Sequence, residues 1–259
     1  MITTWSCGNA KAGMDEDLVE LTAEDASKHP WFQERNAFLI QLLQRIGVNP
    51  QSRILDAGCA WGLTFAALES QGFRTTGLDV SRGALERIDR SDRELIEADL
   101  LVDPPGDHPR FPVVLALDLL EHFDDDALVL ARLSRLVEPS GLLVVAVPAG
   151  EALFSAFDRA SGHRRRYEKA SLRSVFRRAG LRCPTLAPWG LWMRPAMWLA
   201  RRAGATEGES PSDYYRRQLK TPSVPAGWAF RALCRAERPL ALRGLVPLGS
   251  SIFAWIRVP

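Results

Sequence analysis

The sequence predicts an α/β protein built on a mostly parallel sheet with helices covering both faces. Short, continuously apolar runs alternate with amphipathic stretches between residues 53 and 147, the pattern of parallel strands that are buried on both sides. The hydrophobic fraction of 46% and charged fraction of 25% are those of a globular protein. A chain of 259 residues is long enough for one large α/β domain with an elaboration.

The individual elements follow from periodicity and from punctuation by glycine. Apolar residues at helical spacing between residues 29 and 47 predict a first helix, which Gly47 ends. Further helices are expected at 63–71, from Ser81 as a capping residue, at 124–137 and at 170–179. Strands are expected at residues 53–57, 74–78, 94–98, 112–117, 142–147, 182–187 and 250–258.

Charge is distributed unevenly along the chain. Residues 1–150 carry a net charge of −11 and residues 151–259 a net charge of +13. One interpretation is that the two parts attract each other within one fold. The other is that the basic part receives an anionic substrate or an anionic membrane surface. Both interpretations stay open.

Cysteine usage and the absence of targeting patterns indicate a cytoplasmic protein. Cys7, Cys59, Cys183 and Cys234 lie far apart without a CxxC pair, which argues against a disulfide framework or a zinc site. The N-terminus lacks the pattern of a signal peptide, and no run of about 18 apolar residues predicts a transmembrane helix.

A glycine-rich turn follows the first predicted strand and reads Asp56-Ala57-Gly58-Cys59-Ala60-Trp61-Gly62. Glycines at such a turn permit positive φ and close approach of the backbone to a ligand, although dinucleotide enzymes use a similar turn. Carboxylates follow the next three strands, at Asp79, Asp99 and Asp118. In an open parallel sheet these positions meet at the ligand-binding edge.

The succession DxGCxxG, LDVS, ADL, DLLEH and EPSGLLVVAVP resembles class I S-adenosylmethionine (SAM)-dependent methyltransferases, in particular bacterial members with a DxLEH box, over about residues 50–180. The resemblance implies a doubly wound, Rossmann-like sheet of seven strands whose last strand, at 250–258, is antiparallel. It implies SAM as the cofactor and S-adenosylhomocysteine as the product. The expected cofactor-binding residues are Asp56, Gly58, Cys59, Ala60, Gly62, Asp79, Val80, Asp99, Leu100 and Asp118. Ala60 replaces a usual glycine, and Trp61 is expected to crowd the methionine end of SAM.

These elements divide the chain into four parts. Residues 1–50 are expected to form an arm and a helix that contribute to a lid, and residues 51–188 the SAM-binding core. Residues 189–248 form a helical insertion on the acceptor side, because a connection of about 60 residues is too long for a plain loop. Residues 249–259 form the closing strand.

Methyl transfer from a sulfonium to a hydroxyl requires alignment and a proton acceptor. The candidate catalytic residues are His122, which follows the fourth core strand, and His163. A structural role for His122 is the alternative. Asp118, Glu121 and His122 also resemble the acidic-histidine cluster of quinone-biosynthesis O-methyltransferases that use Mg²⁺, but three residues in one loop are a thin basis, and no metal is assigned.

The acceptor side is predicted from two segments outside the core. Residues 158–167 resemble a DxxxGHxRRY segment of bacterial methyltransferases associated with the cell envelope or glycans, and HPWFQER at 29–35 is similar to the HxWFxxR of that group. A solvated turn paired with the acidic half is the alternative. Trp189 to Leu199 is rich in Trp and Met beside Arg194, Arg201 and Arg202, and reads as a packed lid, an acceptor pocket or a membrane-facing surface. The expected substrate-binding residues are Trp31, Arg35, Arg165, Arg166, Tyr167 and Trp192.

The sequence therefore predicts a SAM-dependent methyltransferase acting on a small-molecule or lipid- or glycan-linked acceptor, anionic or hydrophobic, with oxygen favoured as the acceptor atom. The rivals are a SAM-binding protein without catalysis, a nucleic-acid methyltransferase and a Rossmann dehydrogenase. No nucleic-acid partner is expected, because DLLEH replaces the DPPY-like box that holds a flipped base. Peripheral membrane contact remains open.

Overall fold

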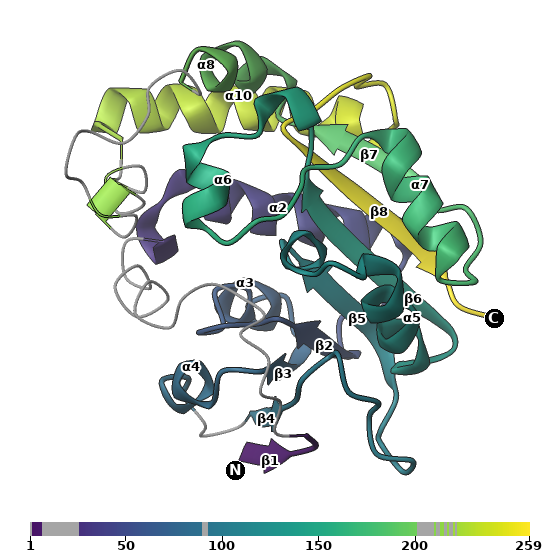
Figure 1. Cartoon of the computed structure of the whole chain (residues 1–259). Helices are drawn as coiled ribbons and strands as arrows, with labels where there is room; N and C mark the ends of the chain where they lie inside the picture. The colour runs from purple at the N-terminus through teal and green to yellow at the C-terminus, as the bar shows by residue number, and fades with distance from the viewer. Residues whose placement is uncertain are drawn as a thin grey trace.

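The computed structural model describes residues 2–6, 26–89, 93–200, 210, 213, 214, 217, 220 and 222–259. A single sheet of eight strands crosses the molecule, in the order β1-β4-β3-β2-β5-β6-β8-β7, and helices pack on both of its faces (Figure 1). All neighbouring strands are parallel except β8, which runs antiparallel to both β6 and β7. The predicted doubly wound, mostly parallel sheet with an antiparallel closing strand is confirmed.

The seven strands expected from the sequence are present, and most are shifted only slightly at their ends. The fifth, expected at 142–147, begins five residues earlier, because Val137 already pairs with Phe111 of β5 ahead of an irregularity in the register. The sixth begins three residues later than expected, because Pro184 precedes it and the extended backbone pairs with β8 only from Thr185 onward. The bounds are β2 Arg53–Ala57, β3 Arg74–Asp79, β4 Glu94–Glu97, β5 Phe111–Leu117, β6 Val137–Pro148, β7 Thr185–Trp189 and β8 Ser251–Arg257.

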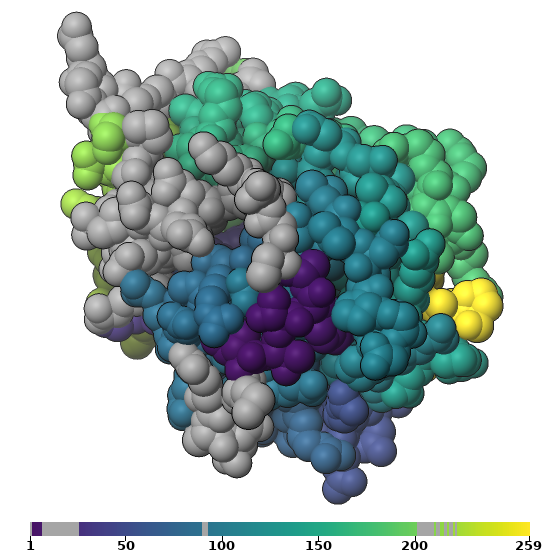
Figure 2. Space-filling view, turned by 60° about the horizontal axis from the view of Figure 1, so that its bottom comes forward, coloured from purple at the N-terminus to yellow at the C-terminus, as the bar shows by residue number. Residues whose placement is uncertain are grey.

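An eighth strand, β1 (Ile2–Thr4), differs from the expected count of seven and from the expected loose arm at the N-terminus. It pairs in parallel with β4, placing Ile2 opposite Leu95. The β-branched side chains of these three residues suit an extended backbone, and the open edge of β4 supplies unpaired hydrogen-bonding groups for them to complete. Figure 2 shows this purple strand at the surface, beside the blue and teal segments of the core.

Alternate residues of the central strands build two separate hydrophobic clusters, one on each face of the sheet. Helices α5 (Asp126–Arg135) and α7 (Lys169–Arg178) pack on the first face. Helices α2 (Pro30–Ile46) and α10 (Val224–Leu242) pack on the second. Figure 1 shows these two helical layers on opposite sides of the strands.

The helix ends follow the expected chemistry. Gly47 closes α2 in the left-handed conformation, with φ of 78°. Ser81 caps α4 (Arg82–Glu86) by accepting a hydrogen bond from the Ala84 backbone N–H. Helices α3 (Phe65–Glu69) and α6 (Ala156–Ala160) are single short turns beside the ligand-binding edge.

The insertion before the closing strand contains a 3-10 turn, η3 (Leu191–Met193), then α8 (Arg194–Ala200) and α10. A buried ion pair between Arg238 of α10 and Glu34 of α2 fixes the insertion to the N-terminal helix. Among the described residues, no helix is long and apolar enough to cross a membrane. Arg201 and Arg202 lie outside the described residues.

Candidate functional site

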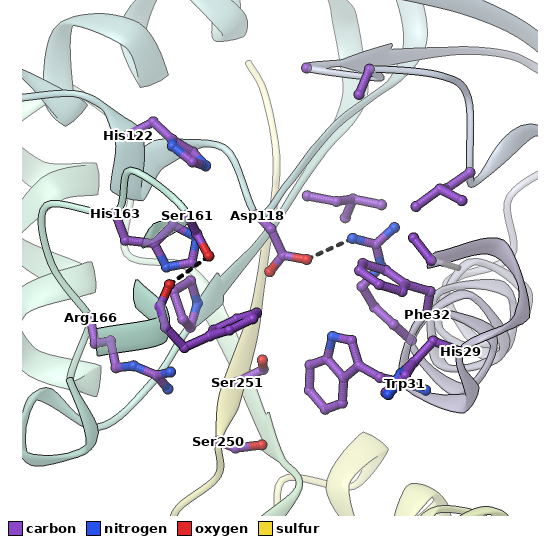
Figure 3. Close-up of a pocket in the computed structure, with 18 of the residues that line it drawn as sticks. His29, Trp31, Phe32, Asp118, His122, Ser161, His163, Arg166, Ser250 and Ser251 are labelled. Atoms are coloured by element: carbon purple, nitrogen blue, oxygen red, sulfur yellow. Dashed lines mark hydrogen bonds and ion pairs between the residues drawn. The ribbon is translucent and has the colours of Figure 1, made fainter. Parts of the chain in front are cut away.

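A cavity of about 380 Å³ lies at the carboxyl ends of β2, β5 and β6. Parallel sheets bind ligands at this edge, where strand ends and helix starts leave side chains and backbone amides unfilled. Figure 3 shows Asp118 in the middle of the cavity. His122, His163 and Arg166 lie on one side of it, and His29, Trp31 and Phe32 from the α2 segment lie on the other.

The glycine-rich turn after β2 forms one wall of this cavity. Gly58 has φ of 74°, and a Cβ added there would lie 2.6 Å from Leu119 Cδ1, so the position requires glycine. Ala60 also adopts positive φ, at 45°. The Asp79 carboxylate accepts the Ala60 backbone N–H at 2.8 Å and the Ser81 backbone N–H at 2.9 Å, which ties the turn to the end of β3.

Arg35 pairs with the Asp118 carboxylate on this side of the cavity. Its Nη1 lies 2.6 Å from Asp118 Oδ2, while its Nε is buried and has no hydrogen-bond partner. Asp118 has φ of 53°, a strained conformation for an aspartate at a strand end. Burial raises the pKa of Asp56 to about 6, against the lowering effects of Arg35 and of a hydrogen bond with Thr64.

Across the cavity, Asp158 holds His163. The two lie 3.1 Å apart, from Oδ1 to Nδ1, and Arg166 Nε donates to the same carboxylate oxygen at 2.8 Å. Ser155 donates to the other oxygen, so the fully buried carboxylate is completely paired. Although burial opposes it, hydrogen bonds from His163 and Arg166 lower the pKa of Asp158 to about 2. This arrangement fixes the ring of His163 at the cavity wall.

Glu121 and His122 behave differently from His163. Glu121 is completely buried with neither carboxylate oxygen hydrogen-bonded, and burial together with Asp118 raises its pKa well above the ordinary value. Burial, with His163 nearby, lowers the pKa of His122 to about 3. Ligand atoms of Glu121, His122 and His163 lie within 4.8 Å of one another and could hold a metal ion. Two imidazoles and one carboxylate suit a borderline ion better than the Mg²⁺ implied by the sequence resemblance.

The remaining wall is apolar. Trp31 stacks on Trp189, with ring centroids 4.6 Å apart, at the start of α2. The insertion contributes Met193, Met197 and Phe230 to the lining. The expected crowding residue, Trp61, also lines the cavity, and its indole N–H is buried without a partner. Flexible methionines and flat aromatic rings suit an apolar ligand.

The structure brings most of the predicted site residues into this one cavity, but not all. The residues that line it are Trp31, Arg35, Asp56, Gly58, Cys59, Ala60, Asp118, His122, His163 and Arg166. Gly62, Asp79 and Val80 lie behind the lining, in the turn and at the end of β3. Asp99 and Leu100 line a separate small pocket beside Trp5 and Ser6, so the residues that follow β1 cover the position expected to meet adenine.

Three expected substrate contacts lie away from the cavity lining. Tyr167 is buried, and its hydroxyl donates to Asp126 at 3.0 Å, which is a packing role. Arg165 pairs with the same aspartate at 3.3 Å. This ion pair agrees with the alternative of a basic turn held by the acidic half. Trp192 packs edge-on against Phe230, behind the wall of the insertion.

Other residues of the site, in the lining or directly behind it, were not singled out from the sequence. Asp158 belongs to the GHxRRY-like segment, and its position five residues before His163 was the sequence signal that could have indicated their contact. Phe230 and Ser250 come from distant parts of the chain and carried no local signal, because only the packing of α10 and β8 brings them to the cavity.

Comparison with solved structures defines the class of fold. A chain from the complex between the Haloferax volcanii Trm112 methyltransferase activator and a methyltransferase is 19% identical, covering 94% of this chain and 98% of that one, with a TM-score of 0.58. The N-methyltransferase NodS of Bradyrhizobium japonicum WM9, in complex with S-adenosylhomocysteine, is 16% identical with a TM-score of 0.53, covering 94% and 97%. The fold is that of the class I SAM-dependent methyltransferases.

Sequence comparison places the chain within a family. Residues 31–186 match the family described as Methyltransferase domain, and the chain belongs to it. A ubiquinone biosynthesis O-methyltransferase of Alkalilimnicola ehrlichii is 36% identical over 100 residues, 36% of this chain and 40% of that protein. Another, of Thiobacillus denitrificans, is 30% identical over 143 residues, 48% of this chain and 60% of that protein. The chain thus spans about half the length of the curated relatives it matches.

Proposed function

We propose that the protein transfers the methyl group of SAM to a hydroxyl oxygen of a small-molecule or lipid-linked acceptor. The observation that carries this proposal is the cavity itself, where the glycine-rich turn and its carboxylates face a histidine held by Asp158. The matched relatives are named O-methyltransferases, which favours oxygen as the acceptor atom. The apolar wall favours an acceptor with a hydrophobic part.

The residues around Arg35 fit the methionine end of SAM. A buried guanidinium with a free Nε suits a carboxylate, and the buried Asp56 suits an ammonium group. Asp79 lies at the end of β3, at the expected ribose position, where a carboxylate suits the ribose hydroxyls. When bound, SAM supplies an activated methyl group on its sulfonium.

The proton of the acceptor hydroxyl requires a base, and His163 suits this role better than His122. Asp158 accepts from Nδ1 of His163, which leaves Nε2 as the proton acceptor of a histidine that lines the cavity; Nε2 lies 3.9 Å from the buried Glu121 Oε1. His163 Nε2 would take the proton of the acceptor hydroxyl as its oxygen receives the methyl group. His122, with its pKa lowered to about 3, stays neutral throughout and shapes the wall.

A transfer assay tests this assignment. Purified enzyme receives methyl-tritiated SAM and phenolic acceptors with and without a long isoprenoid tail, and label is measured in extracted product. We expect transfer to the phenol oxygen, preferentially with the tail. His163→Gln should lower the transfer rate about 100-fold or more, the usual contribution of a general base.

The matched control is His108→Gln, because His108 stands against Trp5 at the other end of the sheet and should be dispensable. Full activity of His163→Gln would refute the role of this histidine. Transfer to amines with none to hydroxyls would refute O-methylation.

A further inference from the structure

Helix α10 packs apolar residues against the second hydrophobic cluster, and its outward face is apolar as well, which is unusual for a surface helix. Buried beneath the helix are Arg238, paired with Glu34, and Cys234, while Glu237 accepts the backbone N–H groups of Gly190 and Leu191. Polar groups of this helix are thus used inward. The exposed apolar residues of α10, here called the α10 face, are Val224, Pro225, Ala226, Trp228, Ala229, Ala232, Leu233, Ala236, Pro239 and Leu240.

The exposure of the largest side chains is high. Trp228 is 74% exposed and Val224 71%, and Leu233 and Leu240 are each 46% exposed. Single exposed apolar residues are ordinary on protein surfaces, but a whole helical face without a neutral polar side chain is not. A helix directed toward water carries polar residues on that side. The α10 face is therefore built to be covered.

The charges beside this face indicate what covers it. The exposed ionic residues of α10 and its C-terminal cap are Arg235 and Arg243, and no exposed carboxylate accompanies them on the helix. A two-fold contact between copies of the chain would place the same arginines near each other, which disfavours a second copy. An apolar face bordered by arginines instead matches the boundary between acyl chains and anionic headgroups.

We propose that the α10 face docks the protein onto a membrane surface containing anionic lipids. The helix lies in the plane of the interface, with Trp228 and Leu233 inserted and Arg235 and Arg243 at the headgroups. Contact is peripheral, because no described helix is long and apolar enough to cross a bilayer. This proposal concerns a surface and stands independently of the methyl-transfer proposal.

The same helix forms part of the cavity wall, which gives docking a consequence for the substrate. Phe230 of α10 lines the cavity from the inner side, and the Arg238–Glu34 ion pair fixes the helix to α2. In the insertion, Met197 faces the cavity while the neighbouring Trp198 and Leu199 are exposed. Docking through α8 and α10 would thus bring two elements that line the cavity to the membrane surface.

Vesicle flotation of the full-length protein tests the docking. We expect the protein to float with vesicles of phosphatidylcholine mixed with phosphatidylglycerol, to bind pure phosphatidylcholine weakly, and to be released by salt. Trp228→Glu combined with Leu233→Glu should lower binding more than tenfold, and Arg235→Ala about fivefold. Leu128→Glu, an exposed leucine on α5 at the opposite face of the sheet, is the matched control and should bind as wild type.

S-adenosylhomocysteine binding, measured on each variant, establishes that the fold and the cofactor side are unaffected. Failure of the wild type to float with anionic vesicles would overturn the proposal, as would equal flotation of the Trp228→Glu/Leu233→Glu variant. Light scattering supplies the other decisive outcome. A wild-type dimer that this variant converts to a monomer, without vesicle binding by either, would assign the face to a second copy instead.

Discussion

Replacing Gly58 with alanine tests whether the turn after β2 is held as tightly as its geometry indicates. Two costs add at this position. The φ of 74° is left-handed, which costs an alanine about 1–2 kcal/mol. The new Cβ would lie 2.6 Å from Leu119 Cδ1, and such overpacking costs about 1–2 kcal/mol even when the leucine moves. We expect Gly58→Ala to lower the free energy of unfolding by about 2–4 kcal/mol, or roughly 5–15 °C in melting temperature.

Two other glycines separate these costs. Gly47 has φ of 78° with no atom within 4 Å of an added Cβ, so Gly47→Ala should show the backbone cost alone, about 1–2 kcal/mol. Gly83, inside α4, has neither positive φ nor a close neighbour, since its nearest contact is Ser81 Oγ at 3.9 Å. Gly83→Ala should therefore stabilise the protein by about 0.5–1 kcal/mol.

The assay is thermal and urea unfolding followed by circular dichroism, with a double-mutant cycle between Gly58→Ala and Leu119→Ala. Removing the leucine side chain should recover about 1 kcal/mol or more in the Gly58→Ala background, because only the overlap is relieved. The reasoning fails if Gly58→Ala costs no more than Gly47→Ala, or if the cycle shows no coupling.

Three further predictions concern titratable groups. The pKa of Asp158 in the folded protein is about 2, below its ordinary 3.8, so its stabilisation of about 2 kcal/mol is present above pH 3.8 and is lost as pH falls to 2. In urea unfolding, the wild type should therefore lose this free energy over that pH range, and Asp158→Asn should not. The pKa of Asp56 is raised to about 6, so its contribution to stability is lost as pH rises from 3.8 through 6. At pH 8, urea unfolding of Asp56→Asn should give a free energy of unfolding up to about 3 kcal/mol above that of the wild type. The same variant should bind S-adenosylhomocysteine weakly. Glu121→Gln should raise the melting temperature at pH 8 in EDTA, since it removes a buried carboxyl that has no hydrogen-bond partner. Metal-dependent stabilisation of the wild type alone would instead identify a metal site.

The sheet was predictable because its signals are local. Apolar runs such as 142–147 are too continuous for a solvent-facing strand, and glycine or serine marks the adjoining helix ends. The β1 strand was not predictable, because three residues carry too little periodicity and only the open edge of β4 selects them. Tertiary pairing supplied what the local pattern lacked.

The site residues likewise include some that local patterns predicted and others that depend on tertiary packing. Asp56 is the second-last residue of β2, and Gly58 and Asp118 directly follow β2 and β5, so the order of strands alone brings them together. The contrast between His122 and His163 depends on burial and on Asp158, which no spacing rule reveals. Tyr167 was expected at the acceptor side because of its polar tip, but Asp126 on α5 satisfies that tip within the core.

The most direct test of the account is calorimetric titration of S-adenosylhomocysteine into the wild type, Asp79→Ala and the control Asp103→Ala. Asp79 lies at the cofactor edge, whereas Asp103 is an exposed carboxylate paired with Arg135. We predict binding by the wild type and by Asp103→Ala, and a loss of about 100-fold or more in Asp79→Ala, equivalent to two charge-assisted hydrogen bonds. A correctly folded wild type that does not bind, or an Asp79→Ala variant that binds as well, would contradict the assignment of this cavity to SAM.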